Sequence, residues 1–169
     1  MIWGDHMKNI ILIGMPGAGK STIGVVLAKT LGLNFLDTDL VIQQIHGAVL
    51  QDILNKNGLV AFKKIENTIL STISVKDSVI ATGGSAVYSA NGMKHLKEDG
   101  TVVYLQLDFE EVNKRIKNIS TRGIVIEDGF SLLDLYNERL PLYKQFAEIT
   151  VECSGLDLEA IVKEITLRI

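Results

Sequence analysis

The sequence predicts an α/β fold in which helices cover both faces of a parallel sheet. Short apolar runs of strand length alternate along the chain with longer segments that have helical spacing. A glycine-rich turn follows the first apolar run directly, as a phosphate-binding connection between a strand and a helix requires. With 169 residues, of which 47% are hydrophobic, the chain is long enough to form one hydrophobic core.

Each element follows from its local pattern. Strands are expected at residues 9–13, 34–36, 78–81, 101–107 and 149–151. Helices are expected at residues 22–31, 42–70, 89–97, 110–117, 131–146 and 158–167. Gly32 should end the first helix, and a break is expected near Gly47. Residues 118–129 have neither helical nor strand periodicity, and the length of this segment is typical of a functional loop. We therefore expect a mobile lid there.

The composition limits the class of protein and the kinds of partner. A net charge of −3 argues against nucleic acid binding, and no apolar run approaches the ~18 residues of a membrane span. The single cysteine, Cys153, permits no internal disulfide, and the start lacks the pattern of an export signal. We therefore expect a cytoplasmic protein, a monomer, with no nucleic acid or membrane partner. Residues 1–7 are expected to be a disordered start or an expression remnant, and residues 8–169 one domain.

The strongest motif lies between the first strand and the first helix and reads Gly14-Met-Pro-Gly17-Ala18-Gly19-Lys20-Ser21. Its glycines let successive backbone N–H groups point into one concavity, where the positive end of the next helix favours a phosphate. Lys20 is expected to reach the β- and γ-phosphates of ATP, Ser21 to bind Mg²⁺, and Thr22 to lie at the α-phosphate. The alternative is a glycine-rich turn that only tightens a corner.

Two carboxylates, Asp37 and Asp39, follow the second strand. They lie at the carboxyl edge of the sheet, where ligands bind in such folds. One carboxylate near the phosphates can hold Mg²⁺ through water, and the other can orient or deprotonate an attacking hydroxyl. The alternative is helix capping, because Asp39 precedes a helical run.

Three arginines, Arg115, Arg122 and Arg139, gather around the expected lid. A guanidinium matches phosphate and carboxylate geometry with paired donors, so these residues suit a cleft that closes over ATP. The alternative for each is ordinary surface charge.

The chain resembles the shikimate kinase family. The resemblance covers nearly the whole chain from Lys8 onward and rests on residues 14–22, 37–39, 62–66, 82–84 and 139–143, together with Arg122. It implies a three-layer α/β/α fold similar to nucleoside monophosphate kinases, with a five-stranded parallel sheet, and transfer of the ATP γ-phosphoryl group to the 3-hydroxyl of shikimate.

The resemblance also implies roles for particular residues. Asp39 would bind the attacking hydroxyl, and Asp37 would serve the Mg²⁺ shell. Arg122 would move with the lid onto the phosphates, and Arg115 would lie against adenine. The substrate pocket would be lined by Gly83 and Gly84, and Arg139 would bind the carboxylate.

Three positions depart from the family pattern. Lys63 stands where an arginine is usual, Ser85 where a third glycine is usual, and Gly123 where a proline usually follows the lid arginine. Lys63 keeps the charge but replaces a two-pronged donor with a point donor, and Ser85 narrows the pocket or adds a hydroxyl contact. Two alternatives therefore stay open: a related kinase with another small hydroxy acid or polyol as acceptor, and an ATP-binding relative without transferase activity.

Several conspicuous residues are expected to be structural. Glu66 should do no more than pair with a neighbouring lysine on its helix. His46 and His95 lack partners at metal-ligand spacing and are expected on helix surfaces, with no zinc site. The apolar stripe over residues 132–143 should be core.

Overall fold

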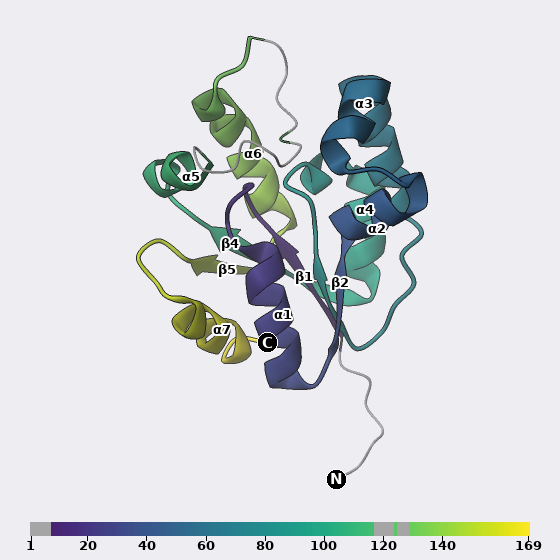
Figure 1. Cartoon of the computed structure of the whole chain (residues 1–169). Helices are drawn as coiled ribbons and strands as arrows, with labels where there is room; N and C mark the ends of the chain where they lie inside the picture. Colours follow the sequence, from purple (N-terminus) through teal and green to yellow (C-terminus); the bar gives the residue numbers. More distant parts are fainter. Residues whose placement is uncertain (1–7, 117–123, 125–128) are drawn as a thin grey trace.

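The protein is a three-layer α/β/α structure built on a five-stranded parallel sheet, as predicted (Figure 1). The computed structural model describes residues 8–116, 124 and 129–169. The strands are β1 (Asn9–Ile13), β2 (Asn34–Asp37), β3 (Ser78–Ala81), β4 (Gly100–Gln106) and β5 (Ile149–Glu152), in the spatial order β2-β3-β1-β4-β5. Residues 1–7, which were expected to be a disordered start or an expression remnant, lie outside the described part of the chain. So do Arg122 and Gly123 of the expected lid.

Helices cover both faces of the sheet. They are α1 (Lys20–Leu31), α2 (Thr38–His46), α3 (Leu50–Leu70), α4 (Ala90–Glu98), α5 (Phe109–Ile116), α6 (Leu132–Phe146) and α7 (Leu158–Thr166), with a short 3-10 helix, η1, at Ala86–Tyr88. Helices α1 and α7 pack side by side on one face, whereas α4 and α6 pack on β4 from the other (Figure 1). The described residues include no helix that is both long and apolar enough to cross a membrane.

The central strands are apolar on both sides because both faces of the sheet are covered. All five residues of β1 are buried, and β1 pairs in register with β3 on one side and β4 on the other. The core continues into α6, where Leu135 and Tyr143 are buried, as the apolar stripe predicted.

The order of the strands opens a crevice at the carboxyl edge of the sheet. The chain leaves β1 for α1 on one face and leaves β3 for η1 and α4 on the other. Ligands of open α/β sheets bind where neighbouring connections diverge in this way. The turn after β1, the end of β2 and the turn after β3 therefore meet at one place.

Helix α3 departs from the prediction. The expected break at Gly47 is present, with Gly47 in the left-handed conformation after α2, but a second break occurs at Gly58 inside α3 (φ 77, ψ 167). The sequence did not reveal this break because isolated glycines are tolerated in helices. Helices α2 and α3 share a small core of their own, formed by Ile42, Ile53, Phe62 and Ile69.

Candidate active site

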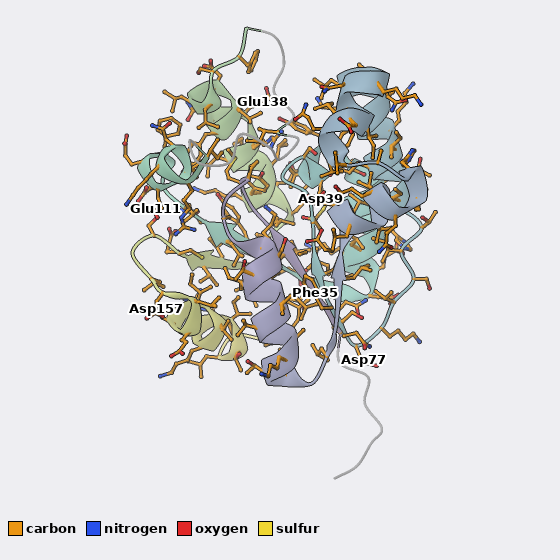
Figure 2. All side chains as sticks on the ribbon, in the orientation of Figure 1. Phe35, Asp39, Asp77, Glu111, Glu138 and Asp157 are labelled. Carbon is orange, nitrogen blue, oxygen red and sulfur yellow. The ribbon has the colours of Figure 1, made fainter. Side chains whose placement is uncertain are left out.

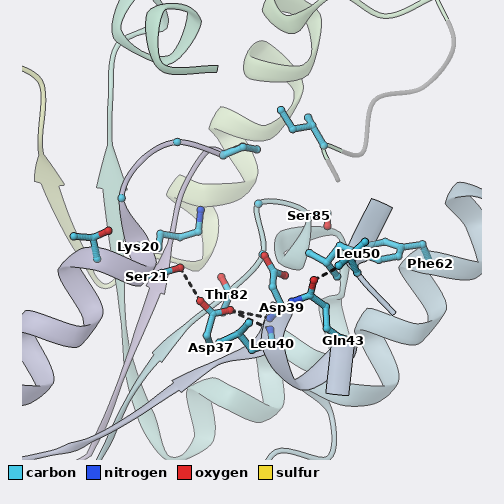
Figure 3. A pocket seen from close by; sticks show the side chains of 18 of the residues that line it. Lys20, Ser21, Asp37, Asp39, Leu40, Gln43, Leu50, Phe62, Thr82 and Ser85 are labelled. Atoms are coloured by element: carbon cyan, nitrogen blue, oxygen red, sulfur yellow. Dashed lines mark hydrogen bonds between the residues drawn. The ribbon is translucent and has the colours of Figure 1, made fainter. Parts of the chain in front are cut away.

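A cavity of about 600 Å³ lies at this crevice and collects most of the predicted site residues (Figure 3). Its walls come from the turn after β1, the start of α2, the start and middle of α3, the turn after β3, and α6. The predicted residues that line it are Gly17, Gly19, Lys20, Ser21, Thr22, Asp37, Asp39, Gly83, Gly84, Ser85 and Arg139.

The turn after β1 has the backbone of a phosphate cradle. Gly17 (φ 80) and Gly19 (φ 88) adopt left-handed conformations that other residues rarely take. A Cβ at Gly14 would lie 2.7 Å from the carbonyl oxygen of Leu105, so that position also requires glycine. Ala18 is fully buried beneath the turn rather than lining the cavity. The turn leads directly into the N-terminus of α1, where backbone N–H groups favour an anion.

Lys20 lies folded along this turn. Its side chain is only 8% exposed, and its ammonium donates to the carbonyl oxygens of Gly14 (2.7 Å) and Met15 (3.0 Å). The charge is thus held within the cradle by the backbone of the turn itself. A buried ammonium that borders an open cavity suits the binding of a polyphosphate.

Ser21 and Asp37 meet across the cavity floor. The Ser21 hydroxyl donates to Oδ2 of Asp37 at 2.6 Å, and Oδ1 of Asp37 accepts the backbone N–H groups of Asp39 (3.0 Å) and Leu40 (3.4 Å). Asp37 is therefore the N-cap of α2. The alternative that Asp39 serves only as a cap is wrong, because Asp39 lies inside the first turn of α2.

These oxygens fit magnesium. Mg²⁺ prefers hard oxygen ligands, keeps several waters, and is commonly held by one or two protein groups together with substrate phosphates. The Ser21 hydroxyl and the Asp37 carboxylate provide such a pair beside the cradle. Within the described residues, no group of three or more His, Cys, Asp or Glu side chains could hold a metal ion.

Asp39 faces the turn after β3. Its side chain points from the start of α2 into the cavity, between Lys20 and Phe62 (Figure 3). A Cβ at Gly83 would lie 2.8 Å from Oδ1 of Asp39, so the carboxylate packs directly on the glycine backbone. Thr38 fixes this arrangement, because its buried hydroxyl oxygen accepts the Gly83 N–H at 3.3 Å.

Arg139 is buried at the opposite wall and lines the cavity. It is 1% exposed, and a Cβ at Gly84 would lie 3.1 Å from its Nη1. The Tyr143 hydroxyl donates to the Gly84 carbonyl oxygen at 2.6 Å and so ties this glycine to α6. A buried guanidinium beside an open cavity is suited to an anionic group of a substrate.

The family model for shikimate kinase matches residues 16–169 of this chain. The chain is 35% identical to a shikimate kinase from Thermodesulfovibrio yellowstonii over 162 residues, which cover 94% of this chain and 93% of that protein. A structure of shikimate kinase from Acinetobacter baumannii in complex with shikimate matches with a TM-score of 0.88 at 35% identity, covering 96% of this chain and 92% of that one. One from Aquifex aeolicus matches with a TM-score of 0.81 at 32% identity, covering 94% of each chain.

The chain belongs to the shikimate kinase family.

Membership in the shikimate kinase family confirms the predicted class of enzyme, an ATP-dependent kinase that uses Mg²⁺. The same comparisons confirm the predicted fold. The structure also shows where two residues that depart from the shikimate kinase pattern lie. Ser85 is buried and lines the cavity, whereas Lys63 is half-buried just behind the lining residues.

Arg115 lies on the far side of the cradle from Asp39. Its Nε donates to Glu111 on α5 (2.9 Å) and its Nη1 donates to the Gly17 carbonyl oxygen (3.2 Å). Glu111 and Asp39 are well separated in Figure 2, with the cradle between them. The position beside Gly17 is compatible with a nucleotide base beyond the phosphates, as the resemblance to shikimate kinases implies.

Glu66 differs most from its prediction. Instead of pairing with a lysine on the surface of α3, it is 1% exposed, and its Oε2 accepts the Ser85 hydroxyl at 2.6 Å. Its Oε1 has no hydrogen-bond partner among the described residues. This oxygen lies close to Gly83, because a Cβ added to that glycine would be 2.7 Å from it. Burial, opposed by the Ser85 bond and reinforced by the nearby Asp39 charge, raises the pKa of Glu66 to about 7.

This raised pKa gives a testable dependence of stability on pH. The folded protein holds the Glu66 proton up to about pH 7, whereas the unfolded chain releases it near 4.5, so the stability contributed by this group falls as the pH rises between these values. The shift corresponds to about 3 kcal/mol of unfolding free energy. We expect Glu66→Gln, which keeps the bond from Ser85, to lose less stability than the wild type between about pH 5 and pH 8.

Urea unfolding across this pH range measures the effect. Glu110→Gln, on the exposed side of α5, is the matched control and should follow the wild type. Identical pH profiles for wild type and Glu66→Gln would show that the buried carboxyl does not titrate in this range.

Several residues at or beside the cavity were not singled out from the sequence, and two of them, Gln43 and Tyr88, join different elements. Gln43 lines the cavity, and its amide oxygen accepts the Leu50 N–H at 3.2 Å, which joins α2 to α3 (Figure 3). Tyr88, on η1, contacts both Lys63 and Arg139. The four-residue spacing from Asp39 places Gln43 on the same helix face and could have revealed it. No local signal identifies Tyr88, because its neighbours come from α3 and α6.

Proposed function

We propose that this kinase transfers the γ-phosphoryl group of ATP to the 3-hydroxyl of shikimate and so forms shikimate 3-phosphate, a step of aromatic amino acid biosynthesis. The observation that carries the proposal is one cavity that joins a phosphate cradle, a carboxylate and a buried guanidinium. The relatives named above support shikimate as the acceptor, since they are shikimate kinases and one of them was solved with shikimate bound.

The acceptor end of the cavity orients an alcohol. Asp39 accepts a hydrogen bond from the attacking hydroxyl and takes its proton as the oxygen bonds to phosphorus. Arg139 binds the carboxylate of the acceptor, and Lys63 adds a second positive charge close to it. The backbone of Gly83 and Gly84 lets the acceptor approach closely, because a side chain at either position would collide with neighbouring groups.

The nucleotide end holds and neutralises the triphosphate. Lys20 and backbone N–H groups of the turn after β1 bind the phosphate oxygens, and Thr22 lies at the α-phosphate. Ser21 and Asp37 would hold Mg²⁺, which would supply positive charge that neutralises the phosphate oxygens. Arg115 packs against adenine, and Arg122, which lies outside the described residues, contributes from the lid.

A coupled assay of ADP release, with and without shikimate, tests the proposal. We expect release that depends on shikimate, with shikimate 3-phosphate identified by mass spectrometry. A panel with gluconate, other hydroxy acids and nucleoside monophosphates extends the test. Transfer to one of these acceptors and none to shikimate would mean that Lys63 and Ser85 select a different substrate. ATP binding without any product would mean that the chain is a non-catalytic relative.

Lys63→Arg tests how the carboxylate is recognised. Lys63 presents a single charged point, whereas arginine offers two parallel donors. We expect the KM for shikimate to fall about tenfold, with kcat and the KM for ATP unchanged. Lys64→Arg, at the exposed neighbouring position, is the matched control. An unchanged or higher KM would show that Lys63 is adapted to another group.

We further infer that the kinase acts in the cytoplasm as a monomer. Supporting this, the single cysteine, Cys153, is buried in the core and so is not available for a disulfide with a second copy of the chain. Light scattering at several protein concentrations would test the monomeric state, and fractionation of the producing cells would test the location. A stable dimer or a membrane-bound fraction would contradict them.

A further inference from the structure

Two positive side chains from different helices lie against the same aromatic ring. The Lys63 ammonium, from α3, lies 4.4 Å from the centroid of the Tyr88 ring. The Arg139 guanidinium, from α6, lies 5.2 Å from the same centroid. The face of an aromatic ring carries partial negative charge and attracts cations. Tyr88 therefore offsets part of the repulsion between two like charges that the fold brings together.

The ring itself is fixed from α6. Its hydroxyl donates to Oε1 of Glu138 and accepts from Nε of Arg139 at 3.2 Å. Glu138 belongs to α6, on the upper part of the molecule in Figure 2. Burial and the bond to Glu138 raise the pKa of Tyr88, so the phenol keeps its proton and remains a donor. Tyr88 is thus bound to α6 through its hydroxyl and to α3 through its face.

This cluster borders the acceptor end of the cavity. Arg139 lines the cavity, and so do Phe62 and Ser85, which neighbour Lys63 and η1 in the chain. Lys63 is not itself a lining residue, but its neighbour Phe62 is, and its ammonium lies over the Tyr88 ring beside this end of the cavity. A lysine has four rotatable bonds and a single donor point, and without such a support it loses more entropy on binding than an arginine fork does.

We propose that Tyr88 is a positioning residue that holds Lys63 and Arg139 together as one carboxylate-binding pair. The inference rests on the proposed function and deepens it, because it assigns recognition of an acidic acceptor to three residues from α3, η1 and α6. Position 63 has a lysine in this chain instead of the arginine that is usual in the family. The aromatic face of Tyr88 restricts the movement of the lysine ammonium.

A purely structural role for Tyr88 makes different predictions. If the ring only fills space between α3 and α6, its removal should affect stability and all kinetic constants together. If it positions the cation pair, its removal should act on the KM of acceptors that carry a carboxylate and should leave ATP binding alone. The test therefore needs a pair of acceptors that differ only in this charge.

The experiment compares wild type, Tyr88→Leu and Tyr88→Phe with shikimate and with its methyl ester. We expect Tyr88→Leu to raise the KM for shikimate about five- to twentyfold, the range for loss of a partly buried cation–π contact, with the KM for ATP within about twofold. Tyr88→Phe keeps the ring face but loses the hydroxyl bonds to Glu138 and Arg139, so its KM for shikimate should lie between those of wild type and Tyr88→Leu. For the ester, wild type and Tyr88→Leu should have the same KM.

Tyr136→Leu is the matched control, since Tyr136 is a half-buried tyrosine of α6 that packs on Phe109 away from the cation pair. Should leucine at position 88 prevent folding, phenylalanine and pentafluorophenylalanine at this position give the same comparison at constant shape, and fluorination should raise the KM for shikimate. An unchanged KM for shikimate, or an equal rise for the ester, overturns the inference. Absence of transfer to shikimate by the wild type instead overturns the proposed function.

Discussion

Replacing Lys20 by alanine is expected to reduce kcat by at least about 10³-fold, the scale observed when one cation is removed from a transferring phosphoryl group. The ammonium already lies in the cradle, on the carbonyl oxygens of Gly14 and Met15, so phosphate oxygens need only approach it. Catalysis of phosphoryl transfer consists mainly of positioning and charge stabilisation, and Lys20 contributes to both.

Single-turnover kinetics with saturating ATP and shikimate measure this loss. Circular dichroism and thermal unfolding show whether the fold is retained, which we expect because the rest of the turn keeps its backbone bonds. Lys29→Ala, on the exposed face of the same helix, is the control and should behave as wild type. Full activity of Lys20→Ala would mean that the turn after β1 is not the phosphate site.

Asp39→Asn has the second largest expected effect. Asparagine keeps the shape of the side chain but cannot take a proton from the acceptor hydroxyl, so we expect kcat to fall by about 10²- to 10⁴-fold. The Kd for ATP should change little, because the cradle and Asp37 are untouched. Rapid-quench measurement of product, with isothermal titration of ATP, separates the two effects.

The control for this variant is Asp52→Asn, at an exposed position in the first turn of α3. If Asp39→Asn retained wild-type kcat, the hydroxyl would have to lose its proton elsewhere, and Glu66, whose Oε1 lies on the same side of Gly83 as Oδ1 of Asp39, would be the next carboxyl to test.

The parts of the fold that depend on local pattern were predictable from the sequence. The apolar run of β1, the glycine spacing of the turn and the start of α1 together placed the cradle, because each requires only neighbours along the chain. The alternation of strands and helices indicated a parallel sheet. The position of Asp37 and Asp39 at the carboxyl edge of the sheet was also predictable, and both line the cavity. The N-cap of α2 is Asp37, whereas the capping alternative had named Asp39.

The rest depends on which surfaces meet in three dimensions. Glu66 is buried because α3 packs over the turn that carries Ser85, and nothing in the spacing of α3 reveals that contact. For the same reason, the contacts of Tyr88 with Lys63 and Arg139 could not be predicted from the pattern of residues around it. The break at Gly58 was missed because a glycine inside a helical pattern has no single outcome.

The two oxygens of Asp37 serve different ends of the site. One receives the hydroxyl of Ser21 beside the cradle, and the other receives the N–H groups that begin the helix carrying Asp39. The Asp37 carboxylate therefore connects the cradle to the helix that carries Asp39, so a movement of it on nucleotide binding would also move the start of α2. By thermodynamic reciprocity, each ligand would then change the affinity for the other by the same factor, which binding measurements in both directions would detect.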